Sequence, residues 1–153
     1  MPTPINRPTF TPNLWRECEQ AYAQNPRAYI LLQDSHKINV NLLLLAQYLD
    51  EKAYLLTQSQ WEILISTTAQ WEESVLQPYR KLRRIAKQHL AEDEYQKMLD
   101  VELIMERKSQ HLLLQRLNNL VGETFNLKHA DNSNKQHYLS LLGLDESVMA
   151  TVN

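Results

Sequence analysis

The segment Asn39-Val-Asn-Leu-Leu-Leu-Leu-Ala-Gln-Tyr-Leu-Asp50 decides the fold of this chain. It contains the longest purely apolar run, Leu42 to Ala46, and as a helix it is apolar almost all round. Such a helix has to be covered on every side, so we expect it at the centre of a helical bundle. Asn39 or Asn41 can cap its start, because asparagine oxygens accept hydrogen bonds from the free amides of a first turn.

The rest of the chain also predicts helices. Only two glycines occur in 153 residues, and the sequence lacks alternating apolar segments joined by Asn-Gly or Asp-Gly hairpin turns. The sequence therefore predicts an all-α, single-domain bundle of five to six helices over residues 13–143. We expect an extended arm at residues 1–12, which hold four of the six prolines, and a C-terminal tail at residues 144–153.

One long helix, from about Ser59 to His89, carries apolar residues in steps of three or four that stay in phase through Pro78. Because a proline removes one backbone hydrogen bond and crowds the carbonyl four residues earlier, we expect a kink at Ser74 to Gln77 rather than a break. After a tight connection near residue 90, a second long helix runs to about Val121. The two long helices should therefore pair as an antiparallel hairpin.

The second half of the first long helix has a strongly basic face. No acidic side chain lies between Glu73 and Glu92, although the net charge of the chain is −2. A helix spreads the basic residues over about 160° of its surface, opposite an apolar stripe that we expect in the core. The apolar stripe consists of Tyr79, Leu82, Ile85 and Ala86. The basic face consists of Arg80, Lys81, Arg83, Arg84 and Lys87.

The antiparallel hairpin would neutralise part of this charge within the chain. In such a hairpin, residues at equal distances from the turn lie side by side. This places Arg80 near Glu102 and Arg84 near Asp100. The residues expected to remain free are Lys81, Arg83 and Lys87. A free cationic face suits an acidic macromolecular surface, so we expect a binding or regulatory protein that docks through this face. RNA or the ribosome is the lead partner, and an acidic protein bound by an adaptor is the close competitor.

A series of blocks between Leu14 and Glu106 has a specific order and spacing. The blocks are Leu31-Leu-Gln-Asp34, Asn39-Val-Asn-Leu-Leu-Leu44, Trp71, Val75, Pro78, Arg80, Arg83-Arg84 and Lys87. In these blocks the chain resembles the DUF2390 family of uncharacterised bacterial helical proteins. It departs from that family at Lys37, where glycine is usual, at Asn39, where aspartate is usual, and at Asn25-Pro26, where a Pro-Gly turn is usual. The resemblance implies a helical fold and a bacterial, cytoplasmic setting, but no established activity and no catalytic residue.

Polar residues beside the central apolar helix form a second candidate site. They could line a small-molecule pocket, or they could serve as helix caps and turn residues. These residues are Gln33, Asp34, Asn39 and Asn41. A small helical enzyme is the alternative of a different class. In it Asp34 would act with Glu102 or Glu106, which lie one helical turn apart and could share acid–base work.

No motif predicts a metal or a cofactor. The paired Glu-x-x-His motifs that build metal sites in helical bundles are missing, and His89 and Asp93 straddle the expected connection between two helices. Cys18 is the single cysteine, and its neighbours Glu17 and Glu19 would raise its pKa, which argues against a reactive thiolate. No apolar run approaches the roughly 18 residues of a membrane helix. We therefore expect a cytoplasmic protein without metal, cofactor or membrane association.

Overall fold

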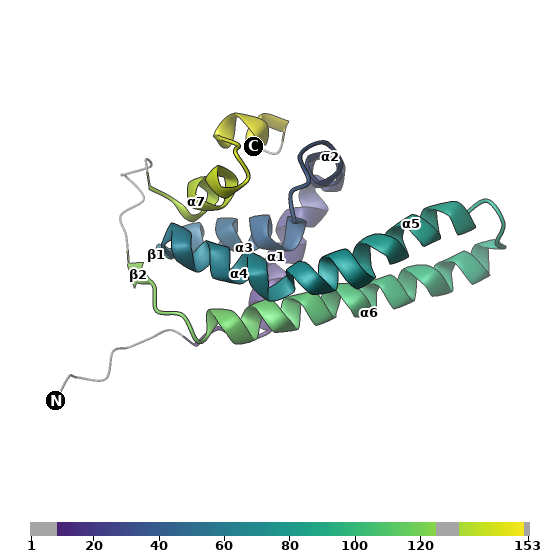
Figure 1. Cartoon of the computed structure of the whole chain (residues 1–153), viewed down its shortest axis with the longest axis horizontal. Helices are drawn as coiled ribbons and strands as arrows, with labels where there is room; N and C mark the ends of the chain where they lie inside the picture. Colours follow the sequence, from purple (N-terminus) through teal and green to yellow (C-terminus); the bar gives the residue numbers. More distant parts are fainter. Residues whose placement is uncertain (1–8, 125–131, 152–153) are drawn as a thin grey trace.

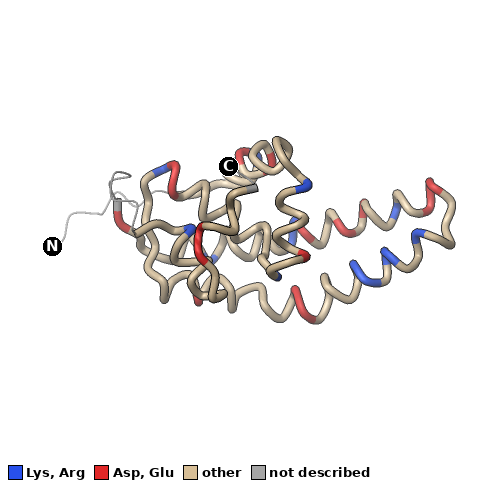
Figure 2. The backbone as a smooth tube through the Cα atoms, turned by 90° about the horizontal axis from the view of Figure 1, so that it is seen from above, with Lys and Arg blue, Asp and Glu red and all other residues tan. Residues whose placement is uncertain are grey.

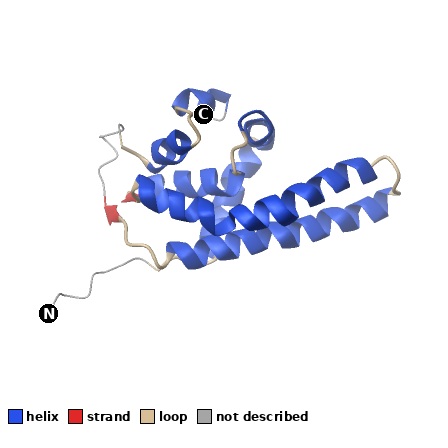
Figure 3. Cartoon of the chain, in the orientation of Figure 1, coloured by secondary structure: helices blue, strands red, loops and turns tan. Residues whose placement is uncertain are grey.

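A computed structural model describes residues 9–124 and 132–151, and it confirms the all-α prediction (Figure 1 and Figure 3). The helices are α1 (Asn13–Gln24), α2 (Pro26–His36), α3 (Val40–Glu51), α4 (Gln58–Trp71), α5 (Gln77–Ala86), α6 (Glu92–Leu117) and α7 (Asn134–Leu141). A π-helical turn, η1 (Glu72–Leu76), joins α4 to α5, and a 3-10 helix, η2 (Glu146–Thr151), follows α7. Two short strands, β1 (Tyr54–Leu55) and β2 (Glu123–Thr124), pair in antiparallel register.

The helix α3 lies at the centre of the bundle, as its composition predicts. It contacts α1, α2 and α7, and side chains such as Leu43 and Leu49 are fully buried. Asn39 caps this helix, because its side-chain oxygen accepts a hydrogen bond from the backbone N–H of Leu42 at 3.3 Å. Asn41, the other candidate for the cap, makes its contacts with α6 instead.

The long helix is continuous from Gln58 to Ala86, because α4, η1 and α5 follow one another with helical backbone angles at both junctions. The irregularity predicted before Pro78 is the π turn η1, in which the backbone N–H of residue 77 reaches the carbonyl of residue 72. A π turn holds one extra residue. Each residue rotates a helix by about 100°, so the inward face moves by one position. Leu76, and not its neighbour Val75 on the predicted stripe, is accordingly fully buried.

The helix α5 and the first half of α6 form a two-helix hairpin that extends beyond the rest of the molecule (Figure 1). The Tyr79 hydroxyl donates to the Met98 carbonyl at 2.7 Å, and the Trp71 indole N–H donates to the Met105 carbonyl at 3.1 Å. These bonds tie the two long helices together, and the predicted antiparallel pairing is confirmed. Since α5 packs mainly on α6 and on its own preceding turn, it has no fully buried side chain.

The turn between α2 and α3 contains a residue in the left-handed region. Lys37 has φ 56° and ψ 31°, and its backbone N–H donates to the Gln33 carbonyl at 3.1 Å. This is the position at which the family that the chain resembles tends to have glycine. Glycine adopts this conformation without steric cost, whereas a side chain adds strain. The tight turn before the central helix therefore forms with a lysine.

Residues 144–151, expected as a tail, pack as part of the domain. Met149 in η2 is buried in the core cluster. The helix α7 before it is fixed at its start by Asp50, whose carboxylate accepts hydrogen bonds from the backbone and side-chain nitrogens of Asn134 at 2.8 and 3.0 Å. The chain therefore continues to contribute to the core after Gly143.

Of the expected N-terminal arm, residues 1–8 lie outside the described residues. Phe10, near the end of the arm, exchanges two hydrogen bonds of 2.9 Å with the side chain of Asn118. Its ring lies edge-on to that of Tyr54, with ring centroids 5.3 Å apart. The arm is thereby attached to the core just before α1.

Candidate functional site

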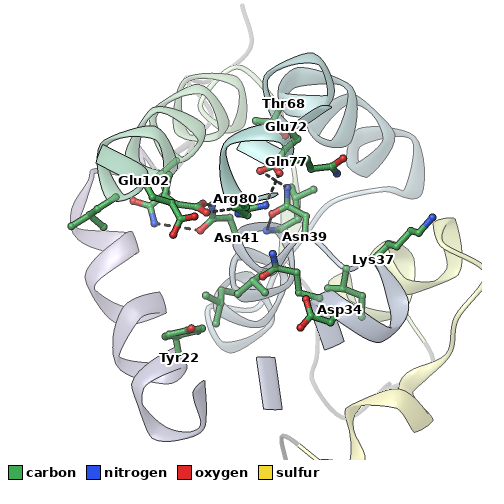
Figure 4. A pocket seen from close by; sticks show the side chains of 18 of the residues that line it. Tyr22, Asp34, Lys37, Asn39, Asn41, Thr68, Glu72, Gln77, Arg80 and Glu102 are labelled. Atoms are coloured by element: carbon green, nitrogen blue, oxygen red, sulfur yellow. Dashed lines mark hydrogen bonds and ion pairs between the residues drawn. The ribbon is translucent and has the colours of Figure 1, made fainter. Parts of the chain in front are cut away.

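A cleft of about 1060 Å³ opens between the start of α3, the long helix α4–α5 and α6 (Figure 4). All four polar residues predicted beside the central helix line it, namely Gln33, Asp34, Asn39 and Asn41. Three members of the basic face also line it, namely Arg80, Lys81 and Arg84, whereas Arg83 and Lys87 do not. The two candidate sites of the sequence therefore meet in one cleft.

Arg80 is the centre of the polar side of this cleft. Its guanidinium forms ion pairs with Glu72, at 3.4 Å, and with Glu106. The side chains of Arg80 and Glu72 are each 14% exposed and that of Glu106 is 27% exposed, so these charges are largely removed from water. Buried charges require partners of opposite sign, and here one cation holds two carboxylates in place.

Amide side chains complete the network around these carboxylates. Asn39 Nδ2 donates to Glu72 Oε1 at 3.3 Å, and Asn41 Nδ2 donates to Glu106 Oε2 at 3.2 Å. Gln110 Nε2 donates in turn to Asn41 Oδ1 at 3.3 Å. Each oxygen of the two carboxylates thus accepts one hydrogen bond from the protein and retains capacity for another donor.

Sequence reasoning misses Glu72 as a site residue, because the predicted apolar stripe passes through Val75. A signal for it exists in the regular spacing of Thr68, Glu72, Leu76 and Arg80, each four residues from the next. Residues four apart lie on one face of a helix. This second stripe, and not the apolar one, faces inward through the π turn.

Arg83 is an ion-pair partner and does not remain free. Its Nε donates to Glu102 at 2.8 Å, and its Nη1 donates to the Tyr95 hydroxyl at 2.9 Å. Arg80 therefore lies near enough to Glu102 to feel its charge but forms its ion pairs with Glu72 and Glu106, and the prediction that Arg83 stays unpaired is wrong. Long side chains lean toward the N-terminus of their own helix. Each arginine consequently reaches a carboxylate about one turn further along α6 than the level of its own Cα.

Three residues of the basic face have no ion pair within the described part of the chain, namely Lys81, Arg84 and Lys87. The predicted pair of Arg84 with Asp100 is not formed, and Asp100 accepts a hydrogen bond from Gln96 at 3.1 Å. The Lys87 ammonium lies over the ring of Tyr95, 5.6 Å from its centroid. Figure 2 shows basic residues gathered along one helix of the hairpin.

Apolar side chains of the hairpin are exposed. Leu82 and Ile85 are each 56% exposed, so the prediction that Leu82 belongs to the core is wrong. The π turn accounts for the difference, because it rotates Arg80 and Arg83 inward and Leu82 and Ile85 outward. Further exposed apolar residues on α6 are Val101, Leu103 and Ile104.

Burial changes the acid–base properties of the cleft. Desolvation raises the pKa of Glu72 above its usual value of 4.5, Arg80 opposes this shift, and Glu106 adds to it. Burial, and then the charge of Glu106, also raise the pKa of Tyr22. Burial is the largest cause that raises the pKa of Cys18 to about 12. A raised pKa favours the protonated thiol, in line with the prediction that Cys18 is not a reactive thiolate.

The carboxylates considered for acid–base catalysis all line the cleft, namely Asp34, Glu102 and Glu106. Glu102 accepts a hydrogen bond from Arg83, and Glu106 accepts one from Arg80. As arranged, the cleft offers carboxylate oxygens that are held in place as hydrogen-bond acceptors.

The described ranges, 9–124 and 132–151, contain no group of three or more His, Cys, Asp or Glu side chains that could hold a metal ion. Among the helices in these ranges, none combines the length and the apolar character needed to cross a membrane.

Comparison with known proteins finds one family. The model of the family described as "Protein of unknown function (DUF2390)" matches residues 13–113, about two thirds of the chain. No curated protein and no solved structure matches the chain. The matched range runs from α1 into the last turns of α6. It contains the whole network of Asn39, Asn41, Glu72, Arg80, Glu106 and Gln110.

Proposed function

The chain belongs to the DUF2390 family, whose description assigns no function, and we propose that it is a non-catalytic binding protein. It docks its α5–α6 hairpin on the acidic surface of a protein partner. The setting is the cytoplasm, as the family resemblance implies. The observation that carries the proposal is the hairpin surface, on which exposed apolar side chains and unpaired basic side chains lie together.

The apolar part of this surface supplies the driving force for docking. Leu82 and Ile85 are one helical turn apart on α5, and both are more than half exposed. Fully burying a side chain of this size contributes about 1.5–3 kcal/mol. Grouped exposed apolar side chains on a soluble protein mark an interaction surface. The hairpin therefore presents a surface that gains stability when a partner covers it.

The basic part selects the partner. Lys81 directly precedes Leu82 and Arg84 directly precedes Ile85, and both basic residues are exposed, with no ion pair among the described residues. Charges at the rim of an interface steer an oppositely charged partner and disfavour partners of like charge. An acidic protein surface with apolar side chains matches both parts of the hairpin.

The same geometry favours a protein over RNA. Arg80 and Arg83, two of the five cations of the basic face, are engaged by glutamates within the chain, so fewer cations remain for phosphates. Proteins that bind single-stranded RNA stack bases on exposed aromatic rings. Tyr79 is half-buried and bonded to α6, and the exposed large side chains of α5 are aliphatic.

The test is affinity capture with the full-length protein from a lysate of the organism that encodes it, with and without ribonuclease. The captured partner is then purified and its Kd is measured. Two double variants probe the two parts of the surface, Lys81→Glu with Arg84→Glu and Leu82→Ser with Ile85→Ser. Each should weaken the Kd by about tenfold or more, because the first reverses the charges that attract an acidic partner and the second removes the apolar contacts.

A matched control separates the hairpin from net charge. The double variant Arg16→Glu with Arg27→Glu makes the same charge change at exposed positions of α1 and α2 and should keep the wild-type Kd. An equal loss of affinity in this control, or a wild-type Kd in both hairpin variants, would show that the hairpin is not the docking surface. Capture that ribonuclease abolishes would identify RNA as the partner and overturn the protein assignment.

A further inference from the structure

We propose that the cleft beside the basic helix binds a small organic cation, an amine that carries an apolar chain or ring. The ammonium group binds the remaining acceptor sites of Glu72 and Glu106 beside Arg80, and the apolar part lies along the wall formed by α1, α3, α4 and α6. Lys81 and Arg84 line this cleft and also belong to the docking surface, but the ammonium contacts proposed here are with Glu72 and Glu106, so neither proposal depends on the other.

The charges of the cleft favour a cation. Seven acidic and four basic side chains line it. Within the buried network, Arg80 faces the two carboxylates of Glu72 and Glu106, so one negative charge is left without a counterion. A charge held away from water without a partner is unfavourable. A ligand ammonium would supply the missing positive charge.

The two carboxylates are oriented before any ligand arrives. Asn39 and Arg80 each donate to one oxygen of Glu72, and Arg80 and Asn41 each donate to one oxygen of Glu106. Every one of these oxygens can accept a further hydrogen bond, and an ammonium group has three donors. Because the side chains are already held, little of their conformational freedom has to be lost on binding.

Thr68 gives an independent indication of a ligand. It lies one turn before Glu72 on the same helix and lines the cleft (Figure 4). The residue is only 1% exposed and makes no side-chain hydrogen bond with residues 9–124 and 132–151, but its hydroxyl is not one of the fully enclosed polar atoms without a partner. The hydroxyl therefore stays open to the cleft, where it can accept a hydrogen bond. A ligand N–H in the cleft would provide one.

The remaining wall of the cleft is apolar. Tyr22, Leu44, Ile65 and Leu99 all line it. Small-molecule sites typically combine such walls with a few fixed polar groups, and an aromatic ring can in addition attract a cation through its face. This composition selects an amine with an apolar body over a small hydrated inorganic cation.

The probe is n-hexylamine, added to the full-length protein and followed by calorimetric titration and by the melting temperature. Hexanol and hexanoate at equal ionic strength are the matched neutral and anionic probes. We expect saturable binding of hexylamine in the millimolar range or tighter, with a rise in Tm, and no binding of the other two. Glu106→Gln should weaken the hexylamine Kd by about tenfold or more, since a hydrogen bond to a charged group is lost. Glu62→Gln, at an exposed position of α4 outside the cleft, should keep the wild-type Kd.

Glu106→Gln also removes the ion pair with Arg80, so a weaker Kd in this variant could have a structural cause. A second measurement therefore uses the wild-type protein. The side-chain NH2 signals of Asn39 and Asn41 in nuclear magnetic resonance spectra should shift with hexylamine and not with hexanol. Absence of saturable hexylamine binding, equal binding of hexanol, or hexylamine binding that leaves both NH2 signals unchanged would overturn the proposal.

Discussion

Arg83 and Glu102 join α5 to α6 in the extended part of the hairpin, with Arg83 Nε 2.8 Å from Glu102 Oε1. Arg83 also donates to the Tyr95 hydroxyl, and the Lys87 ammonium lies over the same ring. Since α5 has no fully buried side chain, we expect these polar contacts to contribute a larger share of the stability of the hairpin than polar contacts contribute in the body.

Removal of this ion pair should destabilise the protein measurably. We expect Arg83→Ala to lower the free energy of unfolding by about 1–2 kcal/mol, because a largely buried pair and a second hydrogen bond are lost together. Urea denaturation measures the change. Arg84→Ala, one residue later and without an ion pair in the described structure, should change the same quantity by less than about 0.5 kcal/mol. Equal effects of the two substitutions would contradict the assignment of Arg83 to the hairpin contact.

Glu72 should make the stability depend on pH in a definite direction. Its folded-state pKa is raised above 4.5, so the folded protein binds this proton more readily than the unfolded chain. The contribution of Glu72 to the free energy of unfolding therefore rises as the pH falls through the folded pKa toward 4.5. Between pH 7 and pH 5, the wild type should gain stability relative to Glu72→Gln in urea denaturation. Glu62→Gln should follow the wild type, and identical pH dependence of all three proteins would refute the shift.

Lys37→Gly should stabilise the fold. The lysine has φ 56°, and a left-handed conformation costs a residue with a side chain about 1–2 kcal/mol relative to glycine, partly offset by the greater freedom of glycine in the unfolded chain. We expect a net gain of up to about 1 kcal/mol in the free energy of unfolding. Ser35→Gly, inside the helical part of α2, should have the opposite sign and cost about 0.5–1 kcal/mol. Destabilisation by both changes would mean that the Lys37 side chain contributes a contact that outweighs its strain.

Asn134→Ala should be among the most damaging single substitutions. Its side chain accepts from the Leu56 N–H at 2.9 Å and from the Trp61 indole at 3.0 Å, and it donates to Asp50 at 3.0 Å. Its loss leaves several buried polar groups unpaired, each at a cost of about 1–3 kcal/mol, so we expect a total loss of about 3 kcal/mol or more. Thermal and urea unfolding check this value. Asn132→Ala, at an exposed position two residues earlier, serves as the control.

The helices and the central place of α3 follow from local sequence, because an all-round apolar helix with the asparagine cap Asn39 has few other solutions. Local sequence does not determine which face of the long helix points inward after residue 72. Whether the helix passes Pro78 by a kink or by a π turn depends on contacts such as those of Glu72 with Asn39 and Arg80, which local rules do not contain. A prediction that assumes a constant α-helical period therefore places Leu82 in the core, whereas its side chain is exposed.

The cleft was predictable in part for the same reason. The polar residues beside α3 and the basic residues of α5 stand out separately in the sequence. Their meeting depends on the packing of the helices, which brings Asn41 to Glu106 across 65 residues of chain. Spacing within one helix indicates which residues share a face, but it does not indicate which distant element that face meets.

The two-helix hairpin also determines which part of this protein unfolds locally first. Amide hydrogens near its tip, in α5 and the first turns of α6, need only the separation of two helices to exchange with solvent, whereas those of α3 need the whole bundle to unfold. The hairpin should therefore exchange as its own cooperative unit, at a lower free energy than the body. A partner that binds the closed hairpin would slow exchange in that unit by mass action. Protection confined to these amides would then map the docking surface without any substitution.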